Sequence, residues 1–269
     1  MAAPSNPGRG GAARRMTLSR TPLLFAGGLL LLALGLWRVD ASPARLLDGL
    51  GKLGWLVTLM WPPSPGGALR DLLEALAETV AMAFLGTLLA ALVALPLCFL
   101  GAGNVIASTL LRFTVRRSYD GLRAVDSLVW ALIFVSAVGM GPFAGILALA
   151  LPDIGLLAKI FSEAIESADR RQVEGVRASG GSRLHAIRYG LVPQAAPVML
   201  SQLLYTFESN TRSATILGVV GAGGIGLALG DRIRLNNWDE VAFIVLLILV
   251  TVAIIDWGSR RLRLRLIRA

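Results

Sequence analysis

Long apolar runs alternate with short polar segments along this chain. Most runs have about the 20 residues that a helix needs to cross the hydrocarbon core of a bilayer. The pattern predicts an all-α polytopic membrane protein with about six transmembrane helices. The six predicted spans are 22–37, 72–100, 124–140, 142–162, 195–218 and 241–257.

The first apolar run has two interpretations. The sequence Val-Asp-Ala at 39–41 is a passable signal-peptidase site. The run reaches about the length of a span and further spans follow it, so we expect an uncleaved anchor. Residues 1–20 are rich in Gly, Pro and Arg and are predicted to be a disordered cytoplasmic N-terminus. Residues 21–71 then form an extra N-terminal span and an external loop.

Basic residues are divided unevenly between the two faces that six spans create. Nineteen of the 26 Lys and Arg residues fall in segments on one face, six on the other, and Arg212 within a span. Because cytoplasmic segments carry the excess of Lys and Arg, both termini and the polar stretch 163–193 are predicted to be cytoplasmic. Residues 104–123 are expected to be an interfacial cytoplasmic helix, and 259–269 a basic cytoplasmic tail.

Composition supports a lipid environment. Of the 269 residues, 55% are hydrophobic and 16% charged, and mean hydropathy is +0.68. Soluble proteins carry about 25% charged residues. The net charge of +9 would suggest nucleic acid in a soluble protein, but here the arginines that orient the spans explain it, so no nucleic-acid partner is expected. Cys98 lies in an apolar run and is expected to be a buried small hydrophobe.

The polar stretch 163–193 predicts a structured element. Apolar and small residues recur at helical spacing from Ile165 to Ser179, so one helix is expected up to Gly180-Gly181. Glycine takes the left-handed cap conformation at low cost. Ser182 is then expected to cap a second short helix, and Pro193 to end it and turn the chain into the fifth span. A loop of this length with its own structure is usually functional.

These residues resemble the EAA loop of ABC importer permeases. Glu174, Gly180 and Pro193 match the Glu, Gly and Pro of that motif in register, whereas Gly175 and Val176 stand at its two alanines. The stretches 128–151, 159–167 and 207–226 further resemble the phosphonate-importer permease of the PhnE type. One departure is "RAVDSLVWALIF", where that family has Ser-Ile-Pro. The resemblance covers most of residues 72–258, which it identifies as the permease core.

The resemblance implies the ABC type I importer (MetI-like) permease fold in the cell membrane. It implies a homodimer with two ATP-binding subunits and an extracytoplasmic substrate-binding protein, importing phosphonate, phosphite or phosphate, with ATP and Mg bound by the partner ATPase and no cofactor by this chain. Another small solute remains an alternative. The residues that it assigns to ATPase coupling are Glu174, Gly175, Ala178, Gly180, Gly181, Ser182 and Pro193.

Several other functions are disfavoured by context. "GAGGIG", with Gly221, Gly223, Gly224 and Gly226, matches a dinucleotide fingerprint but follows a membrane span instead of a strand. We expect an outer glycine bend that faces the translocation path or an outer partner, within an outer loop that runs to residue 239. The chain has no P-loop motif, so ATP hydrolysis belongs to another chain.

Two alternative classes remain, a polytopic membrane enzyme and an ion-coupled carrier. An enzyme needs a metal set, a nucleophile with its base, or two carboxylates at one depth, and the chain has one histidine, His185. Asp126, Asp153, Glu163 and Glu166 are assigned to span ends, so no catalytic or metal site is predicted. Carriers commonly contain repeated halves with broken helices, and no repeat is visible here.

Arg212 lies within the fifth predicted span, where a charged side chain usually faces a cavity or a partner. Glu208 precedes it by four residues, the favourable order for an ion pair on a helix. One interpretation is that the two charges neutralise each other and hold the dimer together. The other is that Glu208, Asn210, Arg212 and Ser213 line the translocation pathway, where a guanidinium binds phosphate-like oxygens. Both remain open.

Overall fold

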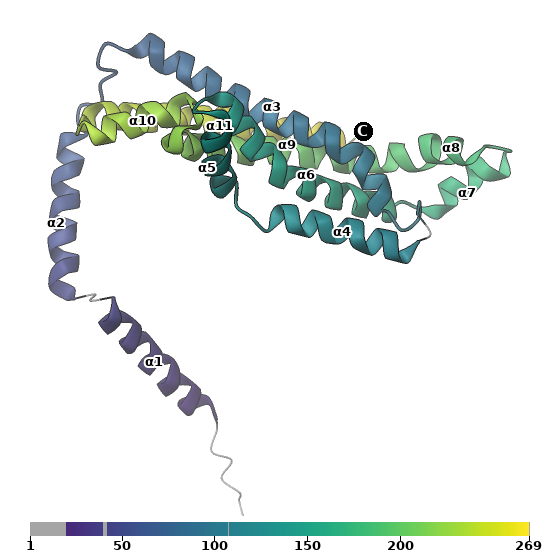
Figure 1. The fold of residues 1–269 in the computed structure, drawn as a ribbon, viewed down its shortest axis with the longest axis horizontal. Coiled ribbons are helices and arrows are strands. Elements are labelled where there is room, and N and C mark those ends of the chain that lie inside the picture. The colour runs from purple at the N-terminus through teal and green to yellow at the C-terminus, as the bar shows by residue number, and fades with distance from the viewer. Residues whose placement is uncertain (1–19, 40–41, 107, 269) are drawn as a thin grey trace, which may run out of the picture. The chain divides into compact units, whose positions relative to one another are not determined.

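The computed structural model describes residues 20–39, 42–106 and 108–268, and this part of the chain is helical without a strand (Figure 1). The chain divides into two units, residues 1–57 and 58–269. The smaller unit contains α1 (Arg20–Arg38) and most of α2 (Pro43–Leu59). α1 confirms that the first apolar run is helical. The predicted disordered segment, except for Arg20, lies outside the described residues.

The larger unit is a bundle built on four long helices, α3 (Leu69–Gly101), α6 (Pro142–Glu166), α9 (Val192–Leu217) and α11 (Trp238–Arg268). Among the described residues, α3, α6 and α11 are each long and apolar enough to cross a membrane. The interfaces of α3, α6 and α9 are rich in fully buried alanines, which let helix backbones approach closely in a bilayer. These alanines include Ala83, Ala90, Ala148, Ala158 and Ala214.

The third predicted span differs from the structure. α5 (Ser127–Val138) has 12 residues, too few to cross a membrane alone. It is bent by 79° from α4 (Thr109–Arg123), and the two together are long and apolar enough for one span. The bend arises because Asp126 starts a new helix, its Oδ1 accepting a hydrogen bond from the Leu128 N–H at 2.8 Å.

The helix predicted within residues 104–123 is α4, which packs along α6. Tyr119 is 2% exposed, and its hydroxyl donates to the Leu97 carbonyl at 2.6 Å. Two ion pairs also join α4 to α6. Lys159 Nζ lies 2.7 Å from Asp120 Oδ1, and Arg116 Nη2 lies 2.7 Å from Glu166 Oε2.

The polar stretch contains more breaks than predicted. The single helix expected up to Gly180 is wrong, because α6 ends at Glu166 and α7 (Arg170–Ala178) starts after Asp169. Pro193 does not end a helix either. α8 (Arg183–His185), the π-helix η1 (Ala186–Leu191) and α9 form one continuous helical run. The wide π turn leaves room for the proline ring, which clashes with the preceding turn of a regular α-helix.

The predicted outer loop is largely helical. After α9 the chain passes through η2 (Gly218–Ala222) into α10 (Gly224–Arg234), with a bend of 59°. α10 packs on α3, α9 and α11, and Ile225 and Gly230 are buried. The apolar contacts that α10 makes with these helices favour a helix in the segment that was predicted to be an outer loop.

Candidate functional site

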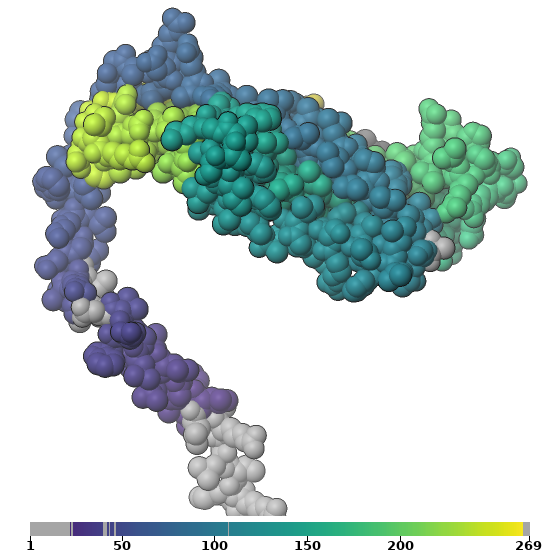
Figure 2. All heavy atoms as spheres, in the orientation of Figure 1, coloured from purple at the N-terminus to yellow at the C-terminus, as the bar shows by residue number. Residues whose placement is uncertain are grey.

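The α7–α8 arm, residues 170–191, lies at the end of the bundle opposite α10 (Figure 1). Figure 2 shows it as a lobe that stands out from the remainder of the larger unit. Glu174, Gly175 and Ala178 lie on α7 and are exposed. An arm with an exposed helix at one end of a membrane bundle is suited to contact a second protein.

The C-terminus of α7 is closed by a Schellman motif. Gly180 has φ +87°, which confirms the left-handed conformation expected from the sequence. Its N–H donates to the Arg177 carbonyl at 3.0 Å, and the Gly181 N–H donates to the Val176 carbonyl at 3.0 Å. These two bonds satisfy carbonyls that the end of a helix leaves without partners, and they define the direction in which the chain leaves α7.

Ser182 caps the next helix, also as predicted. Its Oγ accepts from the His185 N–H, and His185 Nδ1 accepts from the Ser182 N–H, each at 3.4 Å. His185 therefore acts as the return partner of a capping box. The capping motifs around Gly180 and Ser182 together define the turn between α7 and α8, and all their hydrogen bonds join residues that are close in sequence.

Gln194 joins the arm to the bundle. Its Oε1 accepts from the Asp169 N–H at 2.8 Å, while its Nε2 donates to the Gly190 carbonyl at 2.6 Å and to the Asp169 carbonyl at 3.3 Å. A Cβ at Gly190 would lie 3.0 Å from the Val173 Cα, so α7 and η1 are in close backbone contact. Both contacts position the start of α7 relative to α9.

Arg212 belongs to a group of four charges that joins α9 to α11. Its Nη1 lies 3.6 Å from Glu208 Oε1 and 3.5 Å from Asp256 Oδ1. Glu208 has a closer partner, because Arg263 Nη2 lies 2.8 Å from its Oε2. The Arg212 side chain is 46% exposed, whereas that of Glu208 is 12% exposed. Arg212 is thus the most exposed charge of the group, and the Glu208–Arg263 pair is more buried.

Asn210 and Ser213 lie apart from that group. The Asn210 Nδ2 donates to Asp153 Oδ2 at 2.5 Å and to Thr87 Oγ1 at 2.9 Å, which ties α9 to α6 and α3. Ser213 and Asn210 line a cavity of about 190 Å³ together with Asp126 and Asp153. The four residues predicted to line one pathway therefore occupy two faces of α9.

Asp153 also differs from its predicted place at a span end. It lies in the interior of α6, one residue after Pro152, and its carboxylate faces Asn210. A partly buried carboxylate needs hydrogen-bond donors, and the Asn210 amide supplies one. The polar contact between α6 and α9 is therefore formed inside the bundle.

The glycine bend packs inward. Residues 221–226 are all buried, and the Ile225 N–H donates to Thr79 Oγ1 of α3 at 2.8 Å. The Gly141 N–H donates to the Gly221 carbonyl at 3.1 Å, which links the bend to the turn between α5 and α6. A Cβ at Gly226 would overlap the Thr215 carbonyl oxygen and lie 2.9 Å from the Gly218 Cα. Glycine here permits the close approach of α10 to the end of α9.

Within residues 20–39, 42–106 and 108–268, no three His, Cys, Asp or Glu side chains are grouped so that they could hold a metal ion. Three carboxylates of the larger unit, Glu166, Glu208 and Asp153, instead have arginine or amide partners. The polar groups described above therefore connect helices.

Comparison with known proteins identifies the family. The family model of the binding-protein-dependent transport system inner membrane component matches residues 86–268. The chain belongs to this family. Its relatives include a putative phosphite transport system permease protein, HtxC, of Stutzerimonas stutzeri, 37% identical over 87% of this chain and 83% of the relative. Another is a putative cryptic phosphonate transport system permease protein, PhnE2, of Escherichia coli, 47% identical over 44% of this chain and 96% of the relative.

The fold of this family is also found in solved structures. An inward-facing structure of the MetNI methionine ABC transporter contains a chain that is 24% identical, with a TM-score of 0.64 over 72% of this chain and 95% of that chain. The predicted MetI-like ABC permease fold is therefore confirmed. The protein is a multi-pass permease subunit of an ABC importer.

Sequence reasoning missed four residues that connect the candidate sites of the permease. Gln194 holds the arm, Asp153 holds Asn210, and Asp256 and Arg263 complete the charge group. Helical spacing could have separated Asn210 from Arg212, because residues two apart on a helix do not face each other. The pairing of Glu208 with Arg263 has no local signal, since the two residues belong to different helices.

Proposed function

We propose that this permease forms the translocation pathway of an importer for phosphonate, or for the related anions phosphite and phosphate, as a homodimer. Two ATP-binding subunits supply the energy, with ATP and Mg bound on those subunits, and an extracytoplasmic binding protein delivers the substrate. The observation that carries the coupling role is the α7–α8 arm, an exposed helix closed by a Schellman motif and held by Gln194. The names of the relatives, phosphite and phosphonate permeases, support the substrate class.

The proposed cycle follows from this geometry. ATP-driven closure of the two partner subunits pushes on the exposed face of α7, around Glu174. Because Gln194 and the close contact of η1 with α7 connect the arm to α9, the displacement passes into a membrane helix that carries Arg212 and Asn210. Arg212, the most exposed charge of its group, is the residue we assign to attraction of the anion.

Reconstitution tests the function directly. The permease, its ATPase subunits and its binding protein are placed in liposomes, and uptake of radiolabelled methylphosphonate, phosphite and phosphate is measured with and without ATP inside. We expect ATP-dependent uptake of at least one of these anions. Uptake of none of them, by a complex whose ATPase is stimulated by the binding protein carrying a different solute, refutes the proposed substrate class.

The proposed orientation, with both termini and the arm in the cytoplasm, follows from the excess of Lys and Arg on that face. Single cysteines made by Ser64→Cys and Ser182→Cys in a Cys98→Ser background report it, since Cys98 is the one native cysteine. An impermeant maleimide applied to intact cells should label position 64 and leave position 182 unlabelled. The opposite labelling reverses the orientation.

A further inference from the structure

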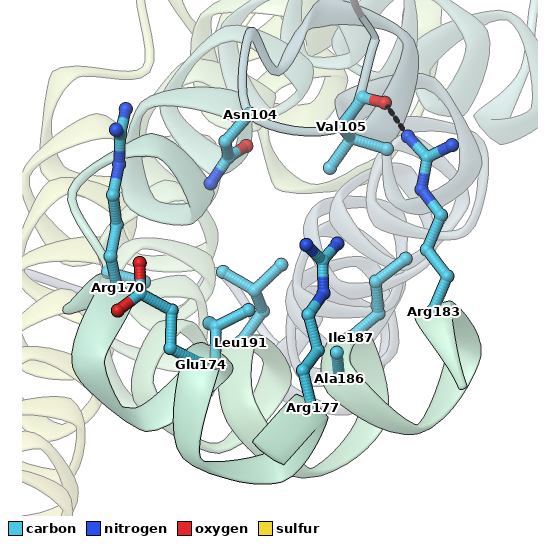
Figure 3. Close-up of a pocket in the computed structure, with 11 residues that line it drawn as sticks. Asn104, Val105, Arg170, Glu174, Arg177, Arg183, Ala186, Ile187 and Leu191 are labelled. Atoms are coloured by element: carbon cyan, nitrogen blue, oxygen red, sulfur yellow. Dashed lines mark hydrogen bonds between the residues drawn. The ribbon is translucent and has the colours of Figure 1, made fainter. Parts of the chain in front are cut away.

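Three arginines surround a cavity between the α7–α8 arm and the link from α3 to α4 (Figure 3). The cavity has a volume of about 340 Å³, near the lower end of the ~300–1,000 Å³ typical of small-molecule sites. Arg170 and Arg177 line it from α7, and Arg183 from α8. In Figure 3 the side chains from α7 point towards the link, and Arg183 reaches the link from the other side.

The charges around this cavity are not balanced. Glu174 is the one carboxylate among the residues that line it, against three guanidinium groups. Arg183 donates to the Val105 carbonyl, which leaves its charge uncompensated. In the described part of the chain, the side chains of Arg170 and Arg177 make no hydrogen bond or ion pair with another residue. Neighbouring like charges repel each other, so this arrangement favours an anion.

The chemistry of the cavity selects a small oxyanion. Guanidinium groups bind tetrahedral phosphorus oxyanions bidentately, through paired N–H donors. The apolar side chains of Val173, Ile187 and Leu191 form part of the wall, and such walls strengthen electrostatic attraction by excluding water. The exposed arginine side chains leave the cavity accessible from the solvent.

We infer that this cavity is a second binding site for a phosphorus oxyanion, separate from the translocation pathway, and that the bound anion slows the transport cycle. In the proposed orientation it faces the cytoplasm, where the imported anion is released, so the inference rests on the proposed function. An anion that bridges the arginines of α7 to Arg183 joins α7 to α8 and the link. If the anion binds more tightly to the arm in this conformation than to the arm in other conformations, it restrains the movement of the arm.

The test uses the complete transporter, with its ATPase subunits, in nanodiscs of phosphatidylcholine. Binding of ³²P-labelled inorganic phosphate is measured in the wild type, in the double variant Arg170→Gln/Arg177→Gln, and in the control Arg171→Gln. Arg171 lies on the same helix and is exposed but does not line the cavity. Each lost charge-assisted contact should weaken binding about tenfold or more. Phosphate binding on the ATPase subunits is common to all three proteins and cancels in the comparison.

We expect phosphate to bind the wild type and the control equally and to lower their ATP hydrolysis, and the double variant to lose both effects. Equal phosphate binding by the double variant and the control overturns the inference. Binding that leaves ATP hydrolysis unchanged refutes the restraint on the arm.

Two further results would also overturn the inference by naming another occupant. If phosphatidylglycerol in the nanodisc displaces phosphate from the wild type and binds through the same arginines, the cavity holds a lipid headgroup. If the wild type binds no phosphate in the cavity and the double variant releases the ATPase subunits, the cavity holds a carboxylate of an ATPase subunit. The liposome uptake assay is a separate measurement. Phosphonate uptake without arginine-dependent phosphate binding refutes this inference alone, whereas binding without uptake of a phosphorus anion refutes the proposed function.

Discussion

Replacement of Gly180 by valine tests whether the shape of the α7–α8 arm couples ATP hydrolysis to transport. Gly180 has φ +87°, and a Cβ added there would meet nothing within 4 Å. The substitution therefore acts through backbone strain and not through a clash. The left-handed conformation costs an L-residue about 1–2 kcal/mol, and it is a genuine outlier for a β-branched one. Such a cost reduces the population of the Schellman conformation at the C-terminus of α7 roughly 5- to 30-fold.

The assay compares this variant with two matched variants in liposomes that contain the complete transporter. Gly180→Asn keeps a residue that tolerates the left-handed region. Gly175→Ala changes a glycine inside α7 that has open space around it, and alanine there favours the helix by about 1 kcal/mol. We expect Gly180→Val to lose at least about fivefold in binding-protein-stimulated ATPase activity and in uptake. Gly180→Asn should retain most of both activities. Gly175→Ala should match the wild type, because the EAA motif that the arm resembles has alanine at this coupling position.

The amount of assembled complex, measured by size-exclusion chromatography, separates coupling from folding. Gly180 is exposed and is not part of the buried clusters of the bundle, so all three variants should assemble in similar amounts. Wild-type stimulation of ATPase activity in assembled Gly180→Val complexes would refute the reasoning. An equal loss in Gly175→Ala would also refute it, because that variant leaves the Schellman glycines in place.

Two further predictions concern the bundle. Gly226→Ala should lower the melting temperature and yield of the permease, because overpacking costs about 1–3 kcal/mol. Gly230→Ala should be tolerated, because the nearest atom to the added Cβ would lie 3.6 Å away. Equal melting temperatures of the two variants would contradict the close packing of α10. Arg263→Gln should destabilise the permease more than Arg212→Gln, because Arg263 is the nearer partner of the poorly exposed Glu208. Thermal unfolding of both variants in detergent measures this, and a larger loss in Arg212→Gln would place the main contact of Glu208 elsewhere.

Local features of the arm were predictable because they depend on neighbours in sequence. The left-handed Gly180 and the capping role of Ser182 involve bonds that reach at most five residues along the chain. The same holds for the long apolar helices, whose composition alone makes a membrane their favourable environment. The capped turn and the apolar helices can therefore be predicted from residues that are close in sequence.

The path of the chain around those features was not predictable in the same way. Pro193 lies inside a continuous helical run because the π turn of η1 accommodates it, and η1 packs closely on α7 at Gly190. The segment after Gly226 is a helix because it packs on α3, α9 and α11. In each case contacts with distant segments outweigh the local preference of proline or glycine to interrupt a helix.

The sequence by itself determined the class of this protein, a polytopic permease with basic loops, and the positions of its apolar helices and of the capped turn in its arm. Only the tertiary structure decided which charges meet. Helical spacing places Glu208 beside Arg212, but the packing of α11 against α9 brings Arg263 to Glu208 and Asp256 to Arg212. The physical reason is that an ion pair between helices depends on their register and rotation, which the sum of many small buried contacts sets and no single stretch of sequence encodes.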